Sequence, residues 1–247
     1  MPKSSLLAAI MLLWPTAVLG AGVAAAVESG VVFAGYNDVR IPPDSGTEFS
    51  LTDDLESNPR AYIRFQGMVH LGRRHELSLL IAPLRLHADG VAQRAITYQG
   101  ETFAAGTPLE ATYRFDSYRI GYLYTFSAGS RWDFGLGFTA KIRDAEISLV
   151  GGGQRAEKVN TGFVPLIGFR ARYALRSGLH ALLAGEALAS PGGQGRAEDV
   201  FAGVVVRATR GVSVRAGYRV LEGGADVDEV YNFALLHYAA LAVRIAL

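Results

Sequence analysis

The stretch SRWDFGLGFTAKIRDAEISLVGGG, from Ser130 to Gly153, decides the expected fold. In its first half, apolar side chains occupy every second position from Trp132 to Ile142, and polar residues or glycines occupy the positions between them. Because successive side chains of a β-strand point to opposite faces, this order predicts a strand with one apolar face and one polar face. Charge then gathers in the second half, beginning at Lys141 and Arg143.

The same alternation recurs along the chain, as it does in transmembrane β-strands. We read ten runs, approximately 31–40, 60–71, 75–87, 109–126, 131–148, 160–175, 179–189, 198–209, 212–222 and 231–246. Short turns, such as 72–74, alternate with the longer segments 41–59, 88–108, 149–159, 190–197 and 223–230. An even strand count with loops sorted by length is typical of transmembrane barrels. We therefore expect an all-β fold, a closed antiparallel transmembrane β-barrel of ten strands with both termini in the periplasm. Within 88–108 we expect a small hairpin with its turn near Gln99-Gly100.

The first 26 residues have the pattern of a secretory signal peptide. Lys3 precedes an apolar run from Leu6 to Leu19, and the small residues Ala24-Ala25-Ala26 follow it. A positive start, an apolar core and a small-residue cleavage site define such leaders. We expect cleavage after Ala26, with the Ala21 region as the second choice. Residues 27–247 then form the barrel domain.

Composition excludes several classes of function. Lys and Arg number 24 against 23 Asp and Glu, so the formal net charge is +1 and a nucleic-acid surface is not indicated. The chain has no cysteine, which excludes disulfides and a lipoprotein anchor. The acidic stretch DVDEVYN, residues 226–232, lacks the glycine and the distant glutamate of an EF-hand loop. We expect no cofactor and no metal.

Taken together, the leader, the alternation and the sorted loops resemble a Gram-negative outer-membrane β-barrel protein over essentially the whole mature chain. The last run, YNFALLHYAALAVRIAL from Tyr231 to Leu247, resembles the terminal strand that the barrel-insertion machinery recognises, although it ends in leucine rather than an aromatic residue. The resemblance implies an outer-membrane location with lipid and lipopolysaccharide as partners. We expect a monomer, because closure removes exposed sheet edges.

If the apolar face meets lipid, the opposite face lines the lumen. The charged positions that we assign to the lumen are Arg64, Arg114, Asp116, Arg119, Lys141, Arg143, Asp144, Glu146, Arg170, Arg172, Glu186, Arg207, Arg215, Arg219 and Arg244. Asp144 and Glu146 have the parity of the lipid-facing residues, so we expect a β-bulge near Arg143 to return them to the lumen. A similar slip near Asp116-Ser117 would keep Asp116 inside.

So many guanidinium groups would repel one another in a narrow barrel unless carboxylates pair with them. We expect a hydrogen-bonded plug of mixed charge, in which Asp116, Asp144, Glu146 and Glu186 balance the arginines. The alternative is a narrow, porin-like channel whose arginines favour small anions, because rings of charge set selectivity. Both interpretations describe a non-enzymatic barrel, either structural or channel-forming.

The runner-up function is a hydrolase at the outer rim, acting on lipid A, phospholipid or peptide. We expect His87 to face inward at the outer end, and Asp226 and Asp228 to lie in an outer loop. A histidine with carboxylates could activate a water molecule, and Ser190 with His87 could form a nucleophilic pair. Neither set has a specific motif. A loop-mediated adhesin is the third alternative, because the segment 41–59 is long.

Overall fold

The computed structural model describes residues 21–128, 131–189, 192 and 194–247. In these residues the regular secondary structure consists of β-strands and turns. The described part of the chain contains no helix that is long and apolar enough to cross a membrane.

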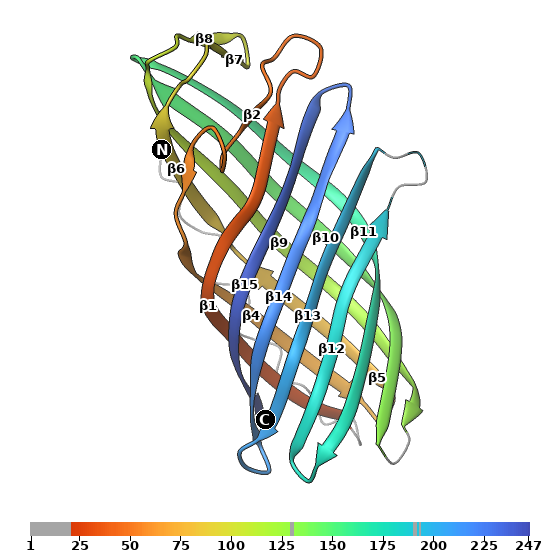
Figure 1. The fold of residues 1–247 in the computed structure, drawn as a ribbon. Helices are drawn as coiled ribbons and strands as arrows, with labels where there is room; N and C mark the ends of the chain where they lie inside the picture. Colours follow the sequence, from red (N-terminus) through yellow and green to blue (C-terminus); the bar gives the residue numbers. More distant parts are fainter. Residues whose placement is uncertain (1–20, 129–130, 190–191, 193) are drawn as a thin grey trace, which may run out of the picture.

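Ten antiparallel strands form a closed barrel (Figure 1). They are β1 (Ala21–Arg40), β4 (Arg60–Leu71), β5 (His75–Ala82) continued by β6 (Arg85–Val91), β9 (Pro108–Ala128), β10 (Trp132–Gly151), β11 (Gln154–Arg176), β12 (Leu179–Ala189), β13 (Gly195–Arg207), β14 (Val212–Val227) and β15 (Val230–Ala246). Because β1 pairs with both β4 and β15, the ring has no open edge. Together, β5 and β6 pair with β9 as one interrupted strand. The predicted ten-stranded antiparallel barrel is therefore confirmed.

The outward face carries an apolar belt. Phe138, Phe163 and Ile120 are 73%, 68% and 65% exposed, whereas the glycine, threonine and lysine positions between the belt residues of β10 are buried. On β10 the belt runs from Trp132 to Ile142, which matches the 9–11 residues that a tilted transmembrane strand needs. Beyond Ile142 the strand continues with polar outward positions. This end of the barrel therefore extends past the belt.

The expected bulges on β9 and β10 are absent, and those two predictions are wrong. The register of β10 with β11 runs without a shift from Trp132 to Gly151. Its register with β9 shifts only between Phe134 and Gly135, far from Arg143 and from Asp116. Without a bulge the parity stays constant. Asp144 and Glu146 therefore remain on the outward face, above the belt, where no apolar environment forces them inward.

The two ends of the barrel differ, as Figure 1 shows: the longer excursions lie at the upper end, and the C-terminus at the lower end. Residues 41–59 contain β2 (Phe49–Ser50) and β3 (Glu56–Ser57), and the next long loop contains β7 (Ile96–Tyr98) and β8 (Glu101–Phe103). The predicted hairpin is confirmed, and its turn residues Gln99 and Gly100 have φ values of 50° and 84°. The expected loops 149–159 and 223–230 are instead mostly paired strand, with turns at 152–153 and 228–229.

Side chains of these loops fill the upper end of the barrel with an apolar cluster, which we call the apolar cap. Its buried members include Phe49, Leu51 and Leu55 from the first loop, Ile96, Tyr98 and Phe103 from the hairpin, and Leu86, Tyr113, Ile147 and Leu149 from the barrel wall. The Tyr98 hydroxyl donates a 2.8 Å hydrogen bond to the carbonyl of Ile147, which ties the hairpin to β10. Burial of this much apolar surface fixes both loops on the barrel.

The N-terminus of the mature protein is the first testable consequence of the fold. Residues 21–26 of β1 pair with residues 66–71 of β4, and Ala24–Ala26 also pair with β15. Cleavage after Ala26 would remove this pairing and leave backbone groups of β4 unsatisfied in lipid. We expect intact-mass analysis of the mature protein to show cleavage in the Ala21 region. A first residue of Val27 would contradict this expectation.

The first loop should also loosen in acid. Burial alone would raise the pKa of Asp54, but hydrogen bonds from Arg94 (2.7 and 3.1 Å) and from the Ser50 N–H (2.9 Å) outweigh it and hold this pKa below its ordinary 3.8. A depressed folded-state pKa stabilises the fold above the unfolded pKa, and the contribution is lost as the pH falls through the folded value. We expect amide protection of residues 50–55 to drop below about pH 4.

Hydrogen exchange, corrected for the intrinsic rate at each pH, measures this loss of protection. Asp54→Asn should lower the protection at neutral pH and remove its pH dependence. Asp44→Asn is the matched control, because Asp44 is exposed and accepts only the hydroxyl of its neighbour Ser45. Equal pH dependence in all three proteins would contradict a role for the Asp54–Arg94 pair.

Candidate functional site: a charge network across the lumen

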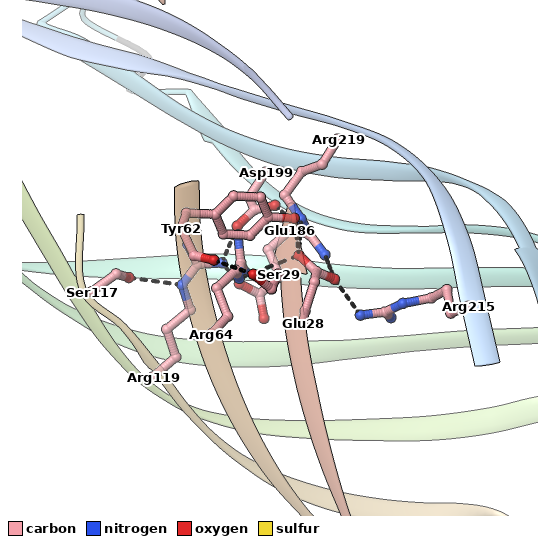
Figure 2. Close-up of polar contacts among 10 residues, drawn as sticks. All are labelled: Glu28, Ser29, Tyr62, Arg64, Ser117, Arg119, Glu186, Asp199, Arg215 and Arg219. Carbon is pink, nitrogen blue, oxygen red and sulfur yellow. Dashed lines mark hydrogen bonds and ion pairs between the residues drawn. The ribbon is translucent and has the colours of Figure 1, made fainter. Parts of the chain in front are cut away.

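Seven charged side chains from different strands meet inside the barrel (Figure 2). They are Glu28 of β1, Arg64 of β4, Arg119 of β9, Glu186 of β12, Asp199 of β13, and Arg215 and Arg219 of β14. We call this set the central network. All seven occupy inward positions of their strands, and six strands on different sides of the barrel contribute to it.

Asp199 lies among three guanidinium groups. Its carboxylate is 3.0 Å from Arg64 Nη2 and 2.8 Å from Arg119 Nη1, and it also accepts a hydrogen bond from Arg219 Nη1. The Asp199 side chain is only 4% exposed. Buried charges persist when they are paired and hydrogen-bonded, and Asp199 meets both conditions. It thereby joins β13 to β4, β9 and β14.

Glu28 likewise lies among three guanidinium groups, those of Arg219, Arg215 and Arg64. Arg219 donates to the two Glu28 oxygens from Nε (3.0 Å) and Nη2 (2.9 Å), a bidentate arrangement that is stronger than a single contact. Arg215 Nη2 donates at 2.5 Å, and the Tyr62 hydroxyl at 3.3 Å. The Arg64 Nε lies 3.8 Å away. Arg64 and Arg219 therefore bridge Glu28 and Asp199.

Arg119 extends the network to β12. Its Nη1 donates at 2.6 Å to Glu186, whose other oxygen accepts a 2.7 Å hydrogen bond from Thr139. Its Nε donates at 2.9 Å to the Ser117 hydroxyl. Ser117 and Arg119 are two residues apart on β9, so both point inward.

Two glycines make room for the aromatic ring beneath these arginines. Gly203 and Gly217 are register partners on β13 and β14, and a Cβ atom on either would lie 2.7 Å from Phe201 Cζ. Phe201 is 1% exposed, and the guanidinium carbons of Arg215 and Arg219 lie 4.7 and 5.5 Å from its ring centre. The ring supports both cations through cation–π contact.

The remaining predicted lumen residues lie above or below the central network on inward positions. Toward the short-turn end, Arg170 pairs with Glu76 at 2.8 Å, and Arg172 pairs with Asp133. Arg244 contacts His70 Nε2 at 2.8 Å, and Arg207 is exposed there. On β10, Lys141 lies 4.8 Å from the Phe115 ring centre, and Arg143 donates to Asn160. The structure thus brings Arg64, Arg119, Glu186, Arg215 and Arg219 together in one network.

Four of the predicted lumen residues lie instead on the outward face, and we correct that assignment. Arg114 Nη1 is 2.5 Å from Asp144 and its Nε is 3.1 Å from Glu146, while Asp116 accepts the Leu84 N–H at 3.1 Å. Constant parity on β9 and β10 places them there, just beyond the belt. Consequently Asp116, Asp144 and Glu146 do not balance the lumen arginines.

The carboxylates that do balance them include two that sequence reasoning missed. Glu28 precedes the run that begins at residue 31, and Asp199 is not among the charged positions that the sequence assigns to the lumen. In both cases the odd–even alternation of the strand could have identified the residue. Asp199 lies on the same face of its strand as the predicted lumen residue Arg207. The apolar alternation of Val31 and Phe33 extends upstream to Val27, which places Glu28 on the opposite, inward face.

The candidate hydrolytic residues do not converge. His87 faces outward on β6, which corrects the expected inward phase, and its Nδ1 lies 3.2 Å from the Thr112 hydroxyl. Asp226 is the second-last residue of β14 and pairs with Tyr231 of β15, so β15, β1 and β4 separate it from β6. Asp228 lies in the adjoining turn, and Ser190 lies outside the described residues. Within the described ranges, no three His, Asp or Glu side chains are grouped to hold a metal ion.

Comparisons with known proteins show the fold. No protein-family model matches the chain, and no curated protein matches it. Among solved structures, the outer-membrane protease OmpT of Escherichia coli is similar with a TM-score of 0.50 and 9% identity, over 92% of this chain and 97% of that chain. The transport unit of the Escherichia coli autotransporter AIDA-I is similar at 0.49 and 9%, over 96% and 94%. Ail of Yersinia pestis is similar at 0.42 and 9%, over 92% and 99%. The chain has the fold of a Gram-negative outer-membrane β-barrel.

Neutralising Asp199 tests the network. Asp199→Asn leaves the shape of the side chain unchanged but removes the only negative charge that Arg64, Arg119 and Arg219 share. We expect a loss of about 3–5 kcal/mol in the free energy of unfolding, which is typical of breaking a buried ion pair. Heat-modifiable gel mobility or urea unfolding of the refolded barrel measures it.

Glu198→Gln is the matched control. Glu198 is the preceding residue on β13, faces outward and is exposed. We expect its unfolding to match the unmodified protein within about 0.5 kcal/mol, as for most surface substitutions. Equal effects of the two substitutions would show that Asp199 stabilises the barrel no more than a surface carboxylate does.

Proposed function

We propose that this chain is an integral protein of a Gram-negative outer membrane, with a closed lumen and a structural role rather than a channel role. The observation that carries the proposal is the central network, in which every guanidinium contacts a carboxylate across the barrel interior. The side chains of Arg119, Glu28 and Asp199 are 3–4% exposed. A permeation path needs charges that water can reach, whereas these side chains are buried.

The apolar cap adds a second barrier in series with the first. Phe49, Tyr98 and Leu149 are at most 1% exposed, and they come from two loops and the barrel wall. An ion that crosses the barrel would have to leave water both at the cap and at the central network. Either step costs several kcal/mol for an unpaired charge. These two layers favour the plug over the narrow anion channel.

The proposed orientation places the short turns and both termini in the periplasm, with the cap outside. Short periplasmic turns and longer outer loops are the usual arrangement in such barrels. The apolar belt would contact membrane lipid, and lipopolysaccharide would surround the polar positions beyond Ile142. The insertion machinery would act on β15, and the closed ring supports a monomer.

The protease activity in the name of OmpT is not part of this proposal. His87 and Asp226 lie on separated strands, so they cannot share one water molecule as acid–base partners. No described contact favours the adhesin alternative.

Single-channel recording of the refolded barrel in a planar bilayer tests the closed lumen. We expect no steady conductance steps from protein that shows heat-modifiable mobility, because the network and the cap both exclude water. A known porin, inserted in the same bilayer, controls for the sensitivity of the recording. Steady steps with anion preference would contradict the proposal and support the arginine-lined channel.

A further inference from the structure

The central network does not balance its own charge. Four guanidiniums, on Arg64, Arg119, Arg215 and Arg219, face three carboxylates, on Glu28, Glu186 and Asp199, so one positive charge is in excess. Lys141 lies opposite Arg119 in the β9–β10 register and is 4% exposed. It adds to the excess whenever it is protonated. Because Asp116, Asp144 and Glu146 face outward, none of them supplies the missing negative charge.

Two donors of the network lack an acceptor among the described residues, Arg119 Nη2 and Arg215 Nε, and Arg119 also lines a cavity. Arg119 Nη1 contacts Glu186 and Asp199, and Nε contacts Ser117. Nη2 is buried and has no hydrogen-bond partner among the described residues. The Arg119 side chain is 3% exposed. Leaving a buried, charged donor unpaired costs more than leaving a neutral one.

A small cavity lies against this residue. Its volume is about 10 Å³, and its polar lining consists of Tyr62, Arg64, Ser117, Arg119 and Tyr238. The other lining side chains are apolar. This volume is close to the minimum that holds a single water-sized particle. No carboxylate lines the cavity, so the carboxylate partners of Arg64 and Arg119 lie outside it.

We propose that this cavity binds a small monovalent anion of the halide class, chloride under ordinary conditions. Arg119 Nη2–H and the Ser117 O–H donate to it. The Ser117 oxygen already accepts a hydrogen bond from Arg119 Nε, which leaves its own proton for an acceptor in the cavity. Arg64 supplies a second positive charge at the cavity wall.

An anion fits these observations better than a water molecule does. Water would satisfy the donors but would leave the excess charge uncompensated in a medium of low dielectric constant. A halide satisfies both, and because chloride is larger than water, the apolar side chains that line the cavity must shift outward to admit it. Sulfate and phosphate carry four oxygens and are too large for the cavity. The site therefore selects by size as well as by charge.

Thermal unfolding of the refolded barrel in detergent, at constant ionic strength, tests the site. Sodium gluconate is replaced stepwise by sodium chloride, so general screening stays constant. We expect the unfolding midpoint to rise with chloride, by about 3 °C at ten times the dissociation constant, and to keep rising with the logarithm of the chloride concentration above it. Bromide should act like chloride. No difference between chloride and gluconate would mean that water alone occupies the cavity, and would overturn the proposal.

Ser117→Ala removes one donor without changing any charge, and we expect it to lose the rise of the unfolding midpoint with chloride. Ser78→Ala is the control, because Ser78 occupies an inward position on β5 but does not line the cavity. If the response survives in Ser117→Ala, the anion binds elsewhere and the assignment is wrong. If Ser117→Ala does not fold, anomalous diffraction from bromide-grown crystals of the unmodified protein decides. A peak beside Arg119 supports the site, and its absence overturns it.

Discussion

The pairing of Asp199 with three arginines is the interaction on which the interior depends. A transmembrane sheet must close, because lipid leaves no partner for unpaired backbone groups. Closure then fixes which side chains point into a narrow lumen, where charge is tolerated only in pairs. Asp199 joins Arg64, Arg119 and Arg219, which come from three separate strands. Together with Glu28, Asp199 offsets the repulsion among the arginines and connects strands on different sides of the barrel through ion pairs.

Height along the barrel decides where charge is tolerated on the outside. On β10 the outward positions are apolar from Trp132 to Ile142 and become acidic at Asp144, at the point where the strand has spanned about the thickness of a membrane. Arg114 pairs with Asp144 and Glu146 in this outer zone. Charged residues therefore occur on both faces of the barrel wall. Within the height of the belt they must face the lumen, whereas beyond the belt they can face outward and no bulge is needed.

Alternation was sufficient to predict the fold class, the strand count and the hairpin turn at Gln99-Gly100, because each depends on neighbours in the sequence. It also assigned Arg64, Arg119 and Arg219 to the inward face. It could not show which of these side chains meet, since that depends on the stagger between strands, and the stagger is a property of the closed barrel. Glu28 and Arg219, for example, lie 191 residues apart in the chain. The predicted bulge near Arg143 was wrong for a related reason. The prediction placed lipid around the strand at Asp144, whereas the apolar belt ends at Ile142.

The cap and the central network act on one another. In the proposed closed lumen, the cap would exclude water and lower the local dielectric constant, which would strengthen each pair in the network and raise the cost of any charge that lacks a partner. A network open to solvent could carry its fourth guanidinium at little cost, because water would screen it. Beneath a sealed cap the same guanidinium needs a counter-charge, and the cavity beside Arg119 is where the described structure has both a free donor and space for one. The proposed closed lumen and the proposed bound anion therefore depend on each other: the more completely water is excluded from the arginines, the more an anion beside them stabilises the barrel.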